Sequence, residues 1–131
     1  DEAFEVLTLS QTGKYGPAPI ILLDRPGGSY WQDWEAYQRD HLLKNGLIHA
    51  DDLSLYMLTD RADVACKYIT NFYRVYHSSR YVGDRFVIRL RTELSDAIVA
   101  SLNEEFADLL ASGSIEKSQA LPGEDHSNTQ A

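Results

Sequence analysis

The chain has 131 residues, of which 44% are hydrophobic and 24% are charged, a composition typical of a soluble globular protein. Its net charge of −8 argues against sequence-independent binding of nucleic acid, which relies on Lys and Arg to neutralise phosphates. A single Cys66 excludes an internal disulfide, and no apolar run approaches the roughly 20 residues of a membrane span, so we expect a reducing, cytoplasmic location without membrane or nucleic-acid partners.

The first segment, "DEAFEVLTLS", predicts a helix that starts at the beginning of the chain. Its apolar residues follow helical spacing, and Asp1, Glu2 and Glu5 fall in the first turn, where the helix dipole favours negative charge. No Ser or Thr cap precedes them. We therefore expect that the loop leading into this helix belongs to a part of the protein that precedes Asp1.

The next segments predict half of a parallel sheet. "IILL" at 20–23 is apolar on both faces, as in a central strand, and "LSLYML" at 53–58 predicts a second strand. Helices are predicted at 30–44 and at about 60–76, so the order is α-β-α-β-α. Two strands cannot have both faces covered by these helices alone, so we expect a missing N-terminal half to supply the neighbouring strands.

A different pattern follows from residue 77. "HSSRYVGD" at 77–84 predicts a loop, and "RFVIRLR" at 85–91 alternates in the manner of a strand with one wet face. Ser95 is the expected cap of a helix that ends by Gly113, and "SIEKS" at 114–118 is predicted to return as a short strand.

These patterns together predict a fold class and three regions. The class is α/β, a partial doubly wound Rossmann-like parallel sheet with helices on both faces, plus a small appended β-α-β element. The regions are a half-domain at 1–78, the appended element at 79–120, and a polar, disordered tail at 121–131.

Several stretches together resemble the C-terminal half of the LOG (Lonely Guy) family, Rossmann-like proteins long labelled lysine decarboxylases. They are "DEAFEVLTLSQTGKYGPAPIILLD", "SYWQDW", "NGLI" and "LTDRADVACKYITNFY". The family's fingerprint is P-G-G-x-G-T-x-x-E, and in register Asp1 and Glu2 are its last two positions. The glycine-rich part and the family's active-site arginine lie upstream and are absent here.

The resemblance implies a nucleoside 5′-monophosphate phosphoribohydrolase, which cleaves the N-glycosidic bond to free base and ribose 5-phosphate without cofactor or metal. Glu2 would be the catalytic glutamate, with Asp1, Thr8 and Gln11 near the substrate. A carboxylate one turn into such a helix can stabilise oxocarbenium charge or orient water, and the preceding loop can hold the phosphate. The resemblance also implies a homodimer or larger assembly, and this fragment alone is expected to be inactive.

An alternative function rests on the basic strand. Arg85, Arg89 and Arg91 are predicted on one face, where they could hold a nucleotide or an acidic partner in a non-catalytic binding module, or pair with nearby acids as an ordinary exposed face. "RPGG" at 25–28 imitates the fingerprint but predicts a plain turn. The four histidines lack ligand spacing, so no metal site is predicted.

Overall fold

The computed structural model describes residues 1–122, and the chain divides into two compact units, 1–76 and 77–131. The sequence placed this boundary at 78/79. The disordered tail predicted at 121–131 lies, from residue 123 onward, outside the described residues.

The first unit is built on two parallel strands, β1 (Ile20–Leu23) and β2 (Tyr56–Thr59). Ile20 lies opposite Tyr56 and Leu23 opposite Thr59, and the ladder continues where the Asp24 N–H donates to the Thr59 carbonyl at 2.9 Å. β2 starts later than the predicted residue 53 because residues 50–54 form a 3₁₀ helix. The Asp52 carboxylate accepts the His49 N–H at 2.7 Å and closes that turn.

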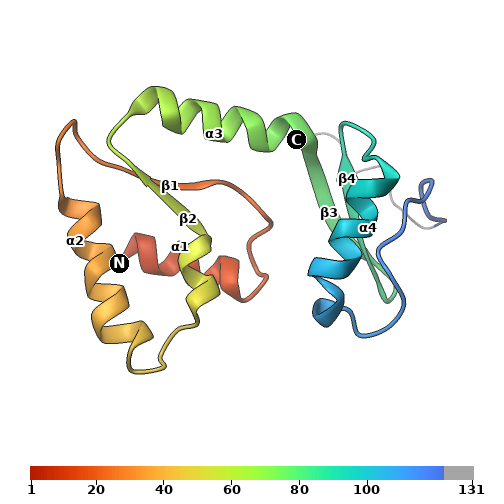
Figure 1. Ribbon diagram of the computed structural model, residues 1–131, viewed down its shortest axis with the longest axis horizontal. Coiled ribbons are helices and arrows are strands. Elements are labelled where there is room, and N and C mark those ends of the chain that lie inside the picture. Colours follow the sequence, from red (N-terminus) through yellow and green to blue (C-terminus); the bar gives the residue numbers. More distant parts are fainter. Residues whose placement is uncertain (123–131) are drawn as a thin grey trace. The chain divides into compact units, whose positions relative to one another are not determined.

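Three helices surround this sheet: α1 (Glu2–Gln11), α2 (Tyr30–Tyr37) and α3 (Ala62–Val75), with a π-helical segment, Gln38–Leu43, continuing α2. In Figure 1 the N-terminal ends of all three helices lie on the side to which β1 and β2 point their carboxyl ends. This is the polarity of a doubly wound α/β sheet. The predicted α/β class with a partial Rossmann-like sheet is confirmed.

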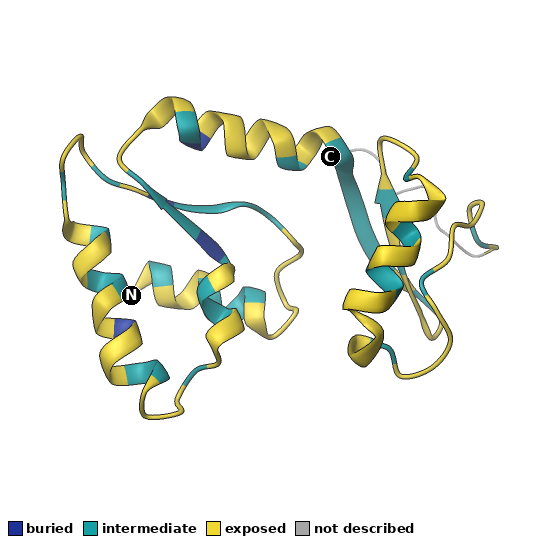
Figure 2. Ribbon diagram, in the orientation of Figure 1, coloured by how far each residue is buried: buried dark blue, intermediate teal, exposed yellow. Residues whose placement is uncertain are grey.

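The core of the first unit is small and largely aromatic. Leu22, Tyr56 and Ala65 are buried, one from each of β1, β2 and α3 (Figure 2). The Trp34 ring on α2 contacts three others at centroid distances of 5.1 to 5.6 Å. These rings are Phe4, Trp31 and Tyr56. Trp34 therefore joins α1, α2 and β2.

Several apolar side chains of β1 and α3 are exposed to solvent in this unit. Leu23 at the end of β1 is 47% exposed and Ile69 on α3 is 41% exposed. On α3 the buried residue is Ala65, and most of the helix is coloured as exposed in Figure 2. The elements of this unit therefore leave part of the sheet and of α3 uncovered.

The second unit starts with a hairpin, β3 (Tyr76–Val82) and β4 (Arg85–Leu90), so the loop predicted at 77–84 is wrong over most of its length. The two-residue connection, Gly83–Asp84, has Gly83 at φ +63°, which suits a tight antiparallel hairpin turn. The polar residues of β3 concealed the strand, because they lack the alternation that marks a half-buried one.

The helix of the second unit, α4 (Asp96–Glu105), starts as predicted. The Ser95 hydroxyl accepts the Ile98 N–H at 3.3 Å and caps it. The helix ends at Glu105, and a 3₁₀ turn, Ala107–Leu109, follows.

The predicted strand at 114–118 does not form, so the described part of this unit is β-β-α rather than β-α-β. The Asn103 amide donates to the Ile115 carbonyl at 2.8 Å and accepts the Ile115 N–H at 2.7 Å. This side chain satisfies the backbone groups that a neighbouring strand would have paired.

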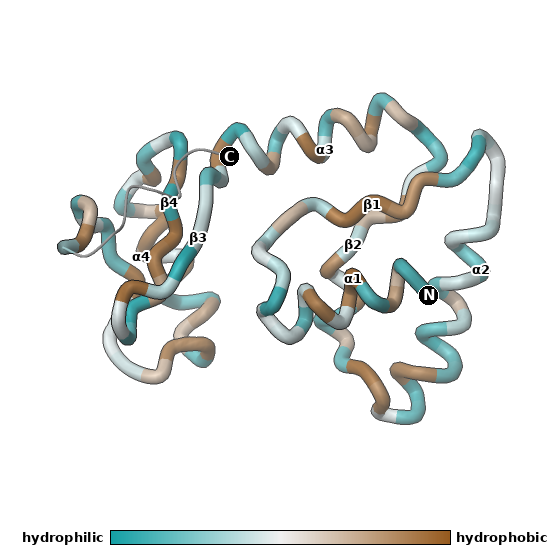
Figure 3. The backbone as a smooth tube through the Cα atoms, turned by 180° about the vertical axis from the view of Figure 1, so that it is seen from behind, coloured by the Kyte–Doolittle hydropathy of each residue, from teal (hydrophilic) through white to brown (hydrophobic). Residues whose placement is uncertain are grey.

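The structure also reverses the burial predicted for β4: the side chains expected to be buried are exposed, and two of those expected to be exposed are partly buried. Phe86 and Ile88, expected to be inside, are 50% and 55% exposed, whereas Val87 and Arg89, expected outside, are half-buried. The apolar face of the hairpin is not covered by the described residues of the unit. In the hydropathy view of Figure 3, brown follows parts of β4 and α4.

Candidate functional site

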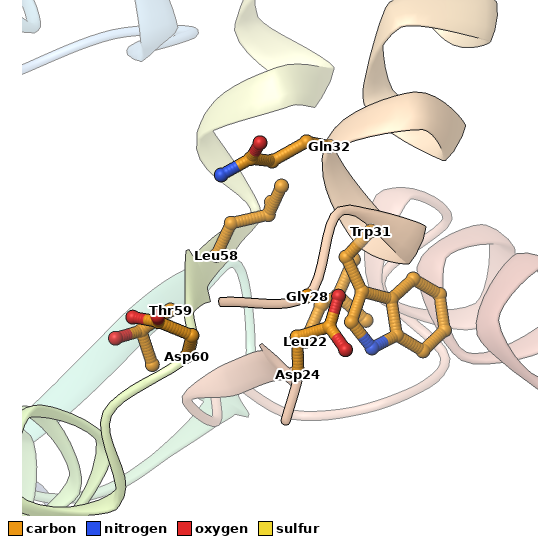
Figure 4. A pocket seen from close by; sticks show the side chains of 8 residues that line it. All are labelled: Leu22, Asp24, Gly28, Trp31, Gln32, Leu58, Thr59 and Asp60. Carbon is orange, nitrogen blue, oxygen red and sulfur yellow. The ribbon is translucent and has the colours of Figure 1, made fainter. Parts of the chain in front are cut away.

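A cavity of the first unit lies at the carboxyl ends of its two strands. It has a volume of about 210 Å³ and receives residues from both strand ends and from the start of α2 (Figure 4). The lining residues are Leu22, Asp24, Gly28, Trp31, Gln32, Leu58, Thr59 and Asp60. In open α/β sheets this edge is where ligands bind.

The loop at 25–28 is fixed to both strand ends by hydrogen bonds. The Gly27 N–H donates to Asp60 Oδ2 at 3.0 Å, and the Arg25 N–H donates to Asp24 Oδ1 at 2.8 Å. The Gly28 N–H closes a turn on the Arg25 carbonyl at 2.9 Å, so the turn predicted for "RPGG" is confirmed. Both aspartates thus shape the rim of the cavity.

Hydrogen-bond acceptors dominate the polar lining of the cavity. Asp24 and Asp60 contribute carboxylates, Thr59 a hydroxyl and Gln32 an amide. The Trp31 indole N–H donates to the Leu23 carbonyl at 3.2 Å, which holds the ring as a wall. The cavity therefore suits a partly apolar ligand that carries hydroxyl or amino donors.

Sequence reasoning missed this cavity. Its signal was present, because an Asp directly follows each strand, in "ILLD" at 24 and "MLTD" at 60. The carboxyl ends of neighbouring parallel strands meet at one edge, so the two aspartates could have been placed together once the strands were paired.

The predicted catalytic and binding acids lie at the exposed tip of α1. The Glu2 side chain is 96% exposed and lies 3.8 Å from the N-terminal ammonium group; Asp1 is also exposed, and neither lines the cavity. Phe4 one turn on contacts Trp34, which contacts the cavity wall Trp31. Through these rings the first turn of α1 is connected to the same edge of the sheet.

The other two predicted binding residues lie together in a second, smaller cavity of about 80 Å³. Thr8 and Gln11 line it with apolar residues of α1 and of the segment after α2. The Gln11 amide donates to Asp52 Oδ1 at 3.0 Å, and the Thr8 hydroxyl donates to the Phe4 carbonyl at 2.8 Å. Both side chains therefore make contacts within the unit, and Gln11 ties α1 to the 3₁₀ helix before β2.

The arginines of β4 do not form one exposed ladder. Arg85 is exposed and lies 3.7 Å from Glu116, Arg89 is half-buried, and Arg91 follows the end of the strand. Within residues 1–122, no group of three or more His, Cys, Asp or Glu side chains could hold a metal ion. Within the same residues, no helix is both long and apolar enough to cross a membrane.

Strand polarity, helix order and the cavity at the carboxyl edge define the first unit as part of a Rossmann-like α/β domain. A family model described as "Possible lysine decarboxylase" matches residues 1–69, just over half of the chain. The chain therefore belongs to this family, the LOG family, and the predicted resemblance is confirmed. No curated protein matches the chain. The match ends within α3, so the second unit lies outside it.

Proposed function

We propose that this chain supplies part of the active-site domain of a LOG-like phosphoribohydrolase, which hydrolyses the N-glycosidic bond of a nucleoside 5′-monophosphate. The observation that carries the proposal is the position of α1 in a chain of this family. Its acidic first turn is at the end of α1 that lies on the side to which β1 and β2 point their carboxyl ends, the end of the strands where the 210 Å³ cavity is also found.

In the proposed reaction, water forms a bond to the anomeric carbon while the bond to the base nitrogen breaks. The departing base keeps the electron pair and takes up a proton, and ribose 5-phosphate is the second product. The developing oxocarbenium charge needs a nearby carboxylate, which we assign to Glu2, as in glycoside cleavage generally. Asp1, Thr8 and Gln11 are proposed to bind substrate. No cofactor or metal is part of the proposal.

The phosphate is proposed to bind at the N-terminal end of α1. Backbone N–H groups and the dipole at a helix start favour an anion, and the loop that would complete this site precedes Asp1. The same missing half would cover the open end of β1 at Leu23 and the exposed face of α3. We therefore propose that these residues act together with an N-terminal half that carries the glycine-rich loop.

The direct test measures free adenine released from AMP by the full-length protein that contains these residues. Glu2→Gln keeps size and removes the charge, and we expect turnover to fall by about 10²- to 10⁴-fold. Glu5→Gln removes a charge from the same turn and is the matched control, which keeps activity. Unchanged adenine release by the Glu2→Gln protein would remove Glu2 from the mechanism.

A second measurement tests the need for the missing half. The 131-residue chain alone is expected to release no adenine, and activity is expected when a polypeptide with the glycine-rich loop is supplied. Full activity of the isolated chain would contradict the claim that the phosphate site depends on residues outside it.

A further inference from the structure

The cavity at the carboxyl ends of β1 and β2 contains none of the residues assigned to the proposed reaction. Asp1, Glu2, Thr8 and Gln11 do not line it. Its lining comes from the ends of both strands, from the loop after β1 and from the first turn of α2 (Figure 4). The ligand of this cavity therefore does not follow from the proposed hydrolase activity.

The charge of the cavity lining is negative. Asp24 and Asp60 contribute carboxylates, and the described residues that line the cavity include no Lys, Arg or His. Arg61 is close enough to Asp60 for their charges to interact, but its guanidinium group donates hydrogen bonds to both carboxylate oxygens of Asp63. A cavity of this charge disfavours phosphate and carboxylate ligands and attracts cations.

An independent observation that points to a ligand is the incomplete hydrogen bonding of Asp24. Its Oδ1 atom accepts the Arg25 N–H at 2.8 Å, whereas its Oδ2 atom is buried and has no hydrogen-bond partner among residues 1–122. Buried polar atoms in native proteins are nearly always paired. The χ2 torsion of aspartate varies broadly, so a small rotation of the carboxylate offers Oδ2 to a donor in the cavity. A ligand N–H group would supply the missing hydrogen bond.

The remaining walls of the cavity are apolar. Leu22 and Leu58 are opposite each other in the parallel ladder, so their side chains point to the same face of the sheet. The Trp31 ring is held by its hydrogen bond to the Leu23 carbonyl, and indole is the aromatic side chain that attracts cations most strongly. The volume of 210 Å³ equals that of about seven liquid water molecules. It therefore suits a short apolar chain with one small charged end.

We propose that this cavity binds a primary alkylammonium ion with a chain of about four carbons. The ammonium group donates hydrogen bonds to Asp24 and Asp60, and the alkyl chain lies against Leu22, Leu58 and Trp31. Charge-assisted hydrogen bonds give the site its specificity, and burial of the chain adds affinity. This inference does not depend on the hydrolase activity, because it concerns other residues and its test measures binding rather than turnover.

Neutral molecules are weaker occupants of the same cavity. Water or an alcohol leaves the charge of the two carboxylates uncompensated. A free adenine has an amino group for Asp24, but its ring nitrogens require donors, and the side chains of the lining offer chiefly the Gln32 amide and the Thr59 hydroxyl. Saturable binding of adenine by a chain that does not bind the alkylammonium ion would indicate a nucleobase site and overturn the proposal.

The first test compares three probes of equal chain length on the 131-residue chain: n-butylammonium chloride, n-butanol and sodium butyrate. NMR follows the indole N–H signal of Trp31, which is identified by its loss in the Trp31→Phe protein. We expect saturable binding of n-butylammonium with a Kd of about 1 mM, binding of n-butanol at least about tenfold weaker, and no binding of butyrate. The absence of saturable binding by n-butylammonium, or equal binding of n-butanol, overturns the proposal.

The second test removes one charge at a time from the cavity. Asp24→Asn and Asp60→Asn each keep an oxygen that can accept the hydrogen bond from the loop, at Arg25 and at Gly27 respectively. Each change is expected to weaken n-butylammonium binding about tenfold or more. Amide NMR spectra of each variant check that the fold is retained. Unchanged affinity in both variants overturns the proposal.

The matched control is Asp51→Asn, which removes the same charge from a side chain that is 97% exposed and does not line the cavity. It is expected to change the affinity for n-butylammonium by less than about twofold, because solvent and salt screen a charge outside the cavity. A loss as large as that of Asp24→Asn would assign the attraction to the net charge of the chain and overturn the proposal.

Discussion

The carboxylate of Asp24 occupies the space beside Gly28 where any larger residue would place its Cβ atom. A Cβ atom at Gly28 would lie 2.3 Å from Asp24 Oδ1 and 2.5 Å from its Cγ. The glycine thus allows the loop after β1 to fold tightly over the end of the strand. This packing holds the rim of the 210 Å³ cavity in place.

Gly28→Ala is therefore expected to destabilise the protein by about 1–3 kcal/mol, because the Asp24 carboxylate must leave its hydrogen bond with the Arg25 N–H. Urea unfolding measures the loss. Gly16→Ala is the control, since no neighbouring atom lies within 4 Å of that position, and it is expected to change stability by less than about 0.5 kcal/mol.

A double variant identifies the cause. If the clash with Asp24 is responsible, Gly28→Ala combined with Asp24→Ala loses less stability than the sum of the two single variants. Strict additivity would mean that the alanine acts through some other contact.

Tyr56 is the polar centre of the aromatic core. Its hydroxyl accepts a hydrogen bond from the Gln38 amide at 3.2 Å and donates to Glu35 Oε1 at 3.3 Å. Burial, followed by the Glu35 carboxylate, raises the pKa of Tyr56 from 10.0 to about 12. The folded state thus holds this proton more tightly than the unfolded state does.

The resulting stabilisation is fully present below pH 10 and is lost as the pH rises from 10 towards about 12. Tyr56→Phe is expected to flatten this decline, and at neutral pH to cost about 1–2 kcal/mol because the buried Gln38 amide loses an acceptor. Phenolate absorbance against pH and urea unfolding test both effects. The exposed Tyr30→Phe is the control, and an equal decline above pH 10 in the Tyr56→Phe protein would contradict the assignment.

The parts of this fold that the sequence predicted are those decided by neighbouring residues. The branched run at 20–23 predicted β1, the turn residues of "RPGG" predicted the bend, and Ser95 predicted the start of α4. Each depends on interactions within a few positions along the chain, which local chemistry specifies.

The parts that failed depend on contacts between distant segments. β3 is polar enough to suggest a loop, and it forms a strand because Gly83 turns the chain back so that β4 can pair with it. The alternation of residues along β4 defines two faces of the strand. Which face is exposed depends on the segments that pack against the hairpin, and the alternation does not specify these. The cavity required the pairing of β1 with β2 before Asp24 and Asp60 could be placed at one edge.

The Asn103 side chain makes the hydrogen bonds to Ile115 that strand pairing would otherwise have made. A third prediction concerns the replacement of this side chain. Asn103→Leu keeps the approximate size but leaves the N–H and carbonyl of Ile115 without this partner. We expect a loss of about 1–3 kcal/mol and faster amide hydrogen exchange at Ile115. Asn103→Asp keeps the acceptor and is expected to lose less. Unaltered exchange at Ile115 in the leucine variant would show that the segment is held by other contacts.

Lys117 connects the same segment to the start of α4, and its charge governs the titration of Asp96. Its ammonium group lies 2.5 Å from Asp96 Oδ1 and 3.1 Å from Glu93 Oε1. The hydrogen bond and charge of Lys117 hold the pKa of Asp96 below its ordinary value of 3.8, and the same carboxylates raise the pKa of Lys117. The interaction therefore stabilises the fold above about pH 3.8 and is lost as the pH falls through the lower pKa of folded Asp96.

Lys117→Met is expected to raise the pKa of Asp96 towards 3.8. The protonation of Asp96 then contributes less to the loss of stability at acid pH. Carboxyl chemical shifts measured against pH by NMR follow Asp96 directly. Lys67→Met, on α3 of the other unit, removes a lysine of the same kind and is expected to leave the Asp96 titration unchanged. Because all these groups are exposed, the effect is also expected to diminish as salt screens the pair. A pKa of Asp96 that stays depressed in the Lys117→Met protein would assign the shift to the dipole of α4 instead.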